Sequence, residues 1–213
     1  MIKIAHFGSY NVNVGDNIAL LNVRKGIEQV SPKQIRWNSV DISSFHGSRL
    51  GMNNIQHAKD LFAKINNEND MLVFGGGGLI EASNRRDNAT KWKLPTNKEI
   101  LSTINIPIVC FALGINYFRG HPKLDETATK RVRNLKESSA LFSLRNDGST
   151  EIFKNLLQDS CQEIPDPGLI CYNQEIKKKE NINNGFFQPA WNNNPNQMLG
   201  RGLTKDNLNK LVS

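Results

Sequence analysis

Residues 71–78 read Met-Leu-Val-Phe-Gly-Gly-Gly-Gly, and residues 107–114 read Pro-Ile-Val-Cys-Phe-Ala-Leu-Gly. Both are short apolar runs that end in glycine. Because neither run alternates with polar residues, each is typical of a strand that is buried on both faces of a sheet. Such strands belong to parallel sheets covered by helices, so the two runs predict an α/β fold.

Further strands and helices alternate around these two runs. The β-branched and apolar character of residues 2–7, 34–40 and 140–144 predicts strands. Helical spacing of apolar residues predicts helices over residues 17–30, 55–65, 98–104, 124–137 and 148–157. The repeated order of strand, helix and strand predicts a doubly wound, Rossmann-like parallel sheet.

The C-terminal part of the chain differs in composition from the rest. We expect a Rossmann-like domain over residues 1–172, a polar linker over 173–184, and the start of an incomplete second α/β domain over 185–213. One strand and one helix cannot close a core of their own around Trp191. We therefore expect a first half whose second half is largely absent. The alternative is an extension that packs on the first domain.

Composition argues against several classes of protein. Of the 213 residues, 38% are hydrophobic and 22% are charged, as in ordinary globular domains. No apolar run reaches the roughly 18 residues of a membrane helix and no signal peptide is recognisable, so we expect a cytoplasmic protein without a transmembrane segment. The net charge is +7, but no basic stripe interleaved with aromatic residues accompanies it, so no nucleic-acid partner is expected. The cysteines and histidines lack ligand spacing, which predicts no metal site.

Four polar features follow predicted strands, where ligands of doubly wound sheets bind. The first comprises Asn13, Gly15 and Asp16. Gly15 permits a tight turn, and Asp16 is expected to cap the helix that begins at Asn17. Free N–H groups at a helix N-terminus favour a site for an anion or a sugar. A plain helix cap is an equal alternative.

The second feature is the glycine run, Gly75, Gly76, Gly77 and Gly78. Glycines let a ligand approach the backbone closely and leave N–H groups exposed. Because no Gly-Lys-Ser/Thr follows, and because the GxGxxG spacing is missing, neither a nucleotide phosphate loop nor a dinucleotide site is predicted. A flexible turn is the alternative.

The third and fourth features follow the next two predicted strands. Asn116, close after Gly114, suits a contact to a sugar hydroxyl, with a turn cap as the alternative. Arg145 lies just past a buried strand, and its guanidinium suits a phosphate or a carboxylate. Asp147 or Ser149 is expected to cap the following helix. The alternative is an ion pair between Arg145 and Asp147 that only holds the turn.

In this order the features resemble the polysaccharide pyruvyl transferase family. The resemblance covers about residues 1–172 and includes Asn13-x-Gly15-Asp16, residues 70–80, residues 107–116, Ser143-x-Arg145 and Asp166-Pro167-Gly168. It implies two Rossmann-like halves that face a cleft, as in the GT-B glycosyltransferases.

The resemblance also implies a reaction: the pyruvyl group of phosphoenolpyruvate is transferred to a sugar of a surface polysaccharide as a ketal, and phosphate is released. This chemistry needs a cation for the anionic donor, an acid for the methylene carbon and a base for the sugar hydroxyl. The resemblance assigns Arg145 to the donor, and Asp16 with Asn13 to the cleft on the acceptor side. It implies phosphoenolpyruvate as a substrate and no further cofactor. The further binding residues that we expect are Gly15, Gly75, Gly76, Gly77, Gly78, Asn116, Asp147 and Ser149.

Two points depart from the family pattern. Asn146 stands between Arg145 and Asp147 where the family has Arg-Asp, so either Asp147 takes that role or the helix cap shifts. The family's second half carries a histidine and further basic residues, which are expected beyond Ser213, so a homo-oligomer or a separate C-terminal half is a candidate partner. Two other functions stay open: a GT-B-like glycosyltransferase that uses a sugar nucleotide, and a non-catalytic binding domain.

Overall fold

The structure is a computed structural model that describes residues 1–10, 14–42, 55–81, 97–116 and 124–169. Its elements, in chain order, are β1 (Ile2–Gly8), α1 (Val14–Val30), β2 (Ile35–Asp41), α3 (Ile55–Glu68), β3 (Met71–Gly75), β4 (Ile80–Glu81), α4 (Lys98–Leu101), β5 (Ile108–Leu113), β6 (Ile115–Asn116), α5 (Glu126–Ser138), β7 (Leu141–Arg145), α6 (Ser149–Leu157), β8 (Gln162–Ile164) and the 3₁₀ helix η1 (Pro167–Leu169). The predicted linker, the predicted second domain and Asn13 lie outside the described residues.

Six strands form one parallel sheet in the order β2-β1-β3-β5-β7-β8. This confirms the predicted α/β, Rossmann-like fold. The chain adds β2 on one side of β1 and β3 on the other, so the connections after β1 and β3 leave in opposite directions. Such a switch point is where doubly wound sheets bind ligands.

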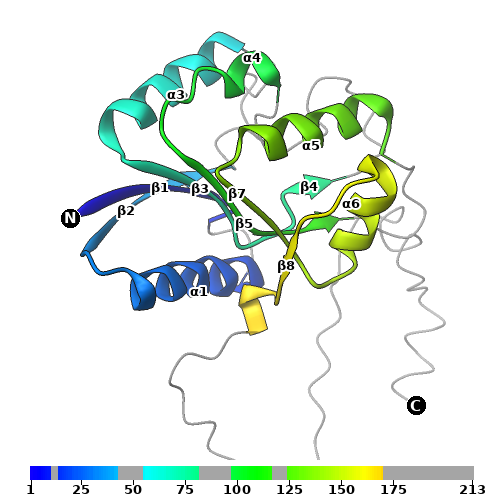
Figure 1. The fold of residues 1–213 in the computed structure, drawn as a ribbon. Helices are drawn as coiled ribbons and strands as arrows, with labels where there is room; N and C mark the ends of the chain where they lie inside the picture. Colours follow the sequence, from blue (N-terminus) through cyan, green and yellow to red (C-terminus); the bar gives the residue numbers. More distant parts are fainter. Residues whose placement is uncertain (11–13, 43–54, 82–96, 117–123, 170–213) are drawn as a thin grey trace, which may run out of the picture.

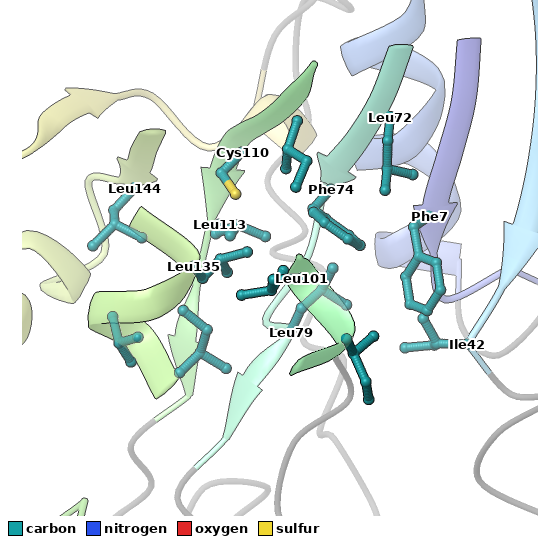
Figure 2. Packing of buried hydrophobic residues seen from close by; sticks show 14 of the residues in the cluster. Phe7, Ile42, Leu72, Phe74, Leu79, Leu101, Cys110, Leu113, Leu135 and Leu144 are labelled. Carbon is teal, nitrogen blue, oxygen red and sulfur yellow. The ribbon is translucent and has the colours of Figure 1, made fainter. Parts of the chain in front are cut away.

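Helices cover both faces of the sheet (Figure 1), with α1 on one face and α3 and α5 on the other. The larger core lies between the sheet and α3, α4, α5 and α6, and Figure 2 shows Phe7, Leu72, Phe74 and Leu113 within it. A smaller cluster around Ile4, Val23 and Val73 lies under α1. Because both faces are covered, the central strands are apolar at successive positions, as their sequences predicted.

Three predicted helix boundaries are wrong by three residues, and one of them is the end of α3, which lies at Glu68 rather than at residue 65. Helix α1 already includes Val14, so Gly15 is helical rather than part of a tight turn, and Asp16 lies in the first turn rather than at the cap. The exposed N–H groups of a helix stabilise a carboxylate in its first turn as well as at its cap, so an aspartate does not mark the start. Helix α4 ends at Leu101 rather than at residue 104, because Thr103 and Ile104 donate to carbonyls three residues back, in tight turns.

The sequence pattern does not predict three of the strands, β4, β6 and β8. β4 and β6 form a separate parallel pair, in which Ile80 lies opposite Ile115. Two residues are too few for any periodicity to be read. β8 is mostly polar and exposed, because it is the edge strand beside β7. The β4–β6 pair nevertheless brings the glycine run close to Asn116.

Candidate functional site

The carboxyl ends of β3, β5, β7 and β8 meet at one edge of the sheet, which we call the carboxyl edge. Side chains and backbone from these strand ends form a connected network there. Its members are Gly78, Asn116, Arg145, Asp147 and Asp166. Members of three of the four predicted features, Gly78, Asn116 and Arg145 with Asp147, are therefore brought together in this network.

Arg145 is at the centre of this network. Its Nε donates to Asp147, Nη1 donates to Oδ2 of Asp166 at 3.1 Å, and Nη2 donates to Oδ1 of Asn116 at 3.2 Å. The side chain is 18% exposed. A Cβ on Gly114 would lie 2.4 Å from Nε, so a glycine at that position gives the guanidinium room. Partners from strand β6, from the turn after β7 and from the turn after β8 thus fix the arginine in place.

The guanidinium retains hydrogen-bonding capacity in this position. It has five N–H donors, and the three bonds within the described residues use one donor each. Two N–H groups are left for a ligand. Asp147 and Asp166 carry two negative charges against one positive charge, however. An anion would therefore be held here by hydrogen-bond geometry rather than by an excess of positive charge.

Asp147 caps α6 as well as binding Arg145. Its Oδ1 accepts from the Ser149 N–H at 3.2 Å and from the Ser149 hydroxyl. The residue at the cap position itself is Gly148, with φ of +93° and no side chain to do this. As predicted for Asp147 or Ser149, it is the Asp147 carboxylate that accepts from the first N–H of the helix. The ion pair between Arg145 and Asp147, the alternative that we gave for Arg145, is present.

Two neighbouring polar residues, Ser149 and Asn146, join the segments that carry the network. Ser149 is 1% exposed, and its Oγ accepts from the Ile115 N–H at 2.8 Å, which joins α6 to β6. Asn146, between Arg145 and Asp147, accepts with Oδ1 from the Asp166 N–H at 3.2 Å. Asn146 therefore ties the loop after β7 to the loop after β8.

Packing within the protein itself requires glycine at the start of the glycine run. A Cβ on Gly75 would lie 2.3 Å from the backbone oxygen of Phe111 on the neighbouring strand. Gly76 has φ of +81°, and a Cβ there would lie 3.0 Å from the backbone nitrogen of Leu20. L-residues with a side chain rarely adopt that φ. The fold alone accounts for these two glycines.

The end of the glycine run contacts the two predicted site residues Asn116 and Asp16. A Cβ on Gly78 would lie 2.0 Å from Oδ1 of Asn116, whose Nδ2 donates to the Gly78 carbonyl at 3.0 Å. A Cβ on Gly77 would instead meet Oδ1 of Asp16 at 3.4 Å, an ordinary contact distance. Within the described residues, no hydrogen bond uses the N–H of Gly76, Gly77 or Gly78. These donors can serve a ligand beside Asp16.

His6 lies beneath the glycine run and is fully buried. Its Nδ1 accepts from Nε of Arg24 at 3.1 Å, so the proton resides on Nε2, which faces the Gly75 carbonyl at 3.4 Å. Burial, and then the positive charge of Arg24, lower the pKa of His6 to about 3. His6 is therefore neutral at physiological pH and supports the backbone of Gly75 rather than transferring protons.

Sequence reasoning left Ser143, Asp166 and Asn22 without a role. Ser143 supports a bulge in β5: its Oγ accepts from the N–H of Ala112 at 3.1 Å and donates to the carbonyl of Cys110 at 3.0 Å. Ala112 has φ of +49°, which is uncommon for a residue with a side chain. Asn22 on α1 donates to the Pro167 carbonyl at 2.7 Å, next to Asp166. In the sequence this contact region is marked by the stretch Asp166-Pro167-Gly168.

The described residues contain neither a metal-binding cluster nor a membrane-spanning helix. In the ranges that the structure describes, no three His, Cys, Asp or Glu side chains are grouped closely enough to hold a metal ion. Among the helices of these ranges, none has both the length and the apolar character to span a bilayer.

Comparison with known proteins gives one result beyond the geometry. A family model described as polysaccharide pyruvyl transferase matches residues 13–211, which is nearly the whole chain. The match includes the carboxyl edge and extends past the last described residue. Searches of curated proteins and of solved structures returned no match.

Proposed function

The chain belongs to the polysaccharide pyruvyl transferase family, and from this premise we propose that it transfers the pyruvyl group of phosphoenolpyruvate to a sugar of a polysaccharide. A proton adds to the methylene carbon, sugar hydroxyl oxygens bond to the central carbon, and the bond from that carbon to the phosphate oxygen breaks. The product is a ketal, and inorganic phosphate takes up a hydroxyl proton. Membership of the family supports the transferase class, and the donor and the ketal are part of the proposal.

Arg145 is the residue that we propose for the donor. It is held at the carboxyl edge by three side chains, and two of its N–H groups have no partner among the residues that the structure describes. A guanidinium fork matches the oxygens of a phosphate or a carboxylate. This placement, at the edge where doubly wound sheets bind ligands, is the observation that carries the proposal.

Asp16 and the glycine run complete the proposed site. Asp16 lies in the first turn of α1, next to Gly77, and its carboxylate can accept a proton from a sugar hydroxyl. The N–H groups of the glycine run are donors for the oxygens of the same ligands. His6 is excluded as the acid for the methylene carbon, because it is buried and its pKa is lowered to about 3. The proposal assigns that acid to no described residue.

Titration of phosphoenolpyruvate into the full chain by calorimetry tests the donor assignment. We expect Arg145→Ala to weaken binding by about 10- to 100-fold, because charge-assisted hydrogen bonds are lost. The affinity of Arg145→Lys should lie between those of the wild type and Arg145→Ala, since lysine keeps the charge but lacks the planar fork. Arg133→Ala, the same change at an exposed position on α5, is the matched control and should bind as the wild type does.

Two results would contradict the assignment. Equal affinity of the Arg145→Ala variant and the wild type would remove Arg145 from the donor site. Binding of a sugar nucleotide but not of phosphoenolpyruvate would favour the glycosyltransferase alternative instead.

A further inference from the structure

Asp166 holds Arg145 from a different part of the chain than Asp147 does. Asp147 is two residues from Arg145 and belongs to the same turn, whereas Asp166 follows β8. Its Oδ2 accepts from Nη1 of Arg145 at 3.1 Å, and its Oδ1 accepts from the Gly168 N–H at 2.8 Å. Each carboxylate oxygen of Asp166 therefore has its own donor.

The turn that carries Asp166 is anchored on two sides. On one side, the N–H of Asp166 donates to Asn146 at 3.2 Å, in the loop after β7. On the other, Asn22 of α1 donates to the Pro167 carbonyl at 2.7 Å in a buried contact. The contacts with α1 and with the loop after β7 hold the turn in place, and Asp166 in this turn binds the guanidinium of Arg145.

We propose that Asp166 is a positioning residue for the anionic donor, acting through Arg145. This inference rests on the proposed function, because it assumes that Arg145 binds phosphoenolpyruvate. With Asp166 on Nη1, Asp147 on Nε and Asn116 on Nη2, the plane of the guanidinium is defined by three separate acceptors. A side chain fixed in this way loses less conformational entropy when it binds a ligand.

Substitution of Asp166 by asparagine separates the positioning of Arg145 from two other effects of Asp166: its stabilisation of the turn and its negative charge. Asparagine has one acceptor oxygen where aspartate has two. If that oxygen keeps the Gly168 N–H and the turn stays intact, the amide NH₂ faces Nη1 of Arg145, donor against donor. The variant thus preserves the turn and removes the contact that orients the arginine.

The change in affinity that we expect for Asp166→Asn is opposite in direction to the change that the loss of a negative charge alone would cause. Removal of a negative charge near an anion site should tighten the binding of a multiply charged anion. Loss of positioning should weaken it. We expect Asp166→Asn to bind phosphoenolpyruvate about tenfold more weakly than the wild type, with a thermal midpoint that is little changed.

The test measures the Kd of phosphoenolpyruvate by calorimetry for the wild type, Asp166→Asn, Arg145→Ala and the double variant. Asp159→Asn is the control: it removes a carboxylate that pairs with Lys136 before β8, at the opposite edge of the sheet, and should leave the Kd unchanged. Because Asp166 acts through Arg145, Asp166→Asn should cost nothing further in the Arg145→Ala background.

The outcomes distinguish failure of this inference from failure of the proposed function. If Arg145→Ala loses affinity while Asp166→Asn binds as tightly as the wild type or more tightly, Asp166 is not a positioning residue, although the donor assignment stands. If Asp166→Asn weakens binding equally with and without Arg145, Asp166 acts elsewhere and the inference is overturned. If the wild type does not bind phosphoenolpyruvate at all, the proposed function falls, and this inference falls with it.

Discussion

Acidification from about pH 7 to about pH 4.5 should destabilise the wild-type chain by about 2 to 3 kcal/mol more than it destabilises a His6→Gln variant. In the folded chain, burial and the neighbouring Arg24 lower the pKa of His6 to about 3, against 6.5 for an ordinary histidine. Between these two pH values the unfolded chain binds a proton that the folded chain does not. The contribution of His6 is therefore fully present above pH 6.5 and is lost as the pH falls towards about 3.

Urea unfolding at a series of pH values measures this difference. Glutamine does not titrate, and its amide can still donate to the Gly75 carbonyl, which accepts from His6 in the wild type. All carboxylates are common to the two proteins, so their contribution cancels when the two pH dependences are subtracted. If the free energies of unfolding of the wild type and the variant changed with pH in parallel, His6 would titrate normally, and the assignment of a buried, neutral His6 would be wrong.

Gly75→Ala is expected to lower the free energy of unfolding by about 3 kcal/mol or more. The added Cβ would lie 2.3 Å from the Phe111 carbonyl oxygen, so β3 and β5 would have to separate in the centre of the sheet. Gly77→Ala is the matched variant in the same run, where the nearest atom is Oδ1 of Asp16 at 3.4 Å. It should change stability by less than about 1 kcal/mol.

Chemical denaturation of both variants tests this contrast. Similar losses of stability at the two positions would mean that the run is a flexible loop in which no glycine is individually required. If Gly75→Ala lowered the free energy of unfolding only slightly, the close approach of Gly75 to Phe111 would not exist in solution.

Much of the fold could be predicted because the central strands carry strong local signals. The runs before Gly75 and Gly114 are apolar at successive positions, a pattern that is typical of short strands covered on both faces. The short strands β4, β6 and β8 could not be predicted in this way. They owe their existence to neighbours distant in the sequence, as Ile80 does to Ile115.

The candidate site could be located from the sequence, but its internal contacts could not. Arg145 was predicted at a strand end because a charged residue that directly follows a buried strand must lie at its carboxyl end. Its pairing with Asp166 joins residues 21 apart and depends on β8, a strand without a sequence signal. The glycine run was predicted as a ligand contact, and the structure adds a second requirement, since Gly75, Gly76 and Gly78 each make room for the protein's own atoms.

A crystal structure of the full chain grown with phosphoenolpyruvate is the most direct test of the central claim. The account predicts phosphate or carboxylate oxygens of the ligand within about 3 Å of the Arg145 guanidinium, at the carboxyl edge of the sheet. Asp147, Asp166 and Asn116 should keep their bonds to Arg145 in that complex. Phosphoenolpyruvate bound away from Arg145, or a carboxyl edge that stays empty at a saturating concentration of the ligand, would contradict it.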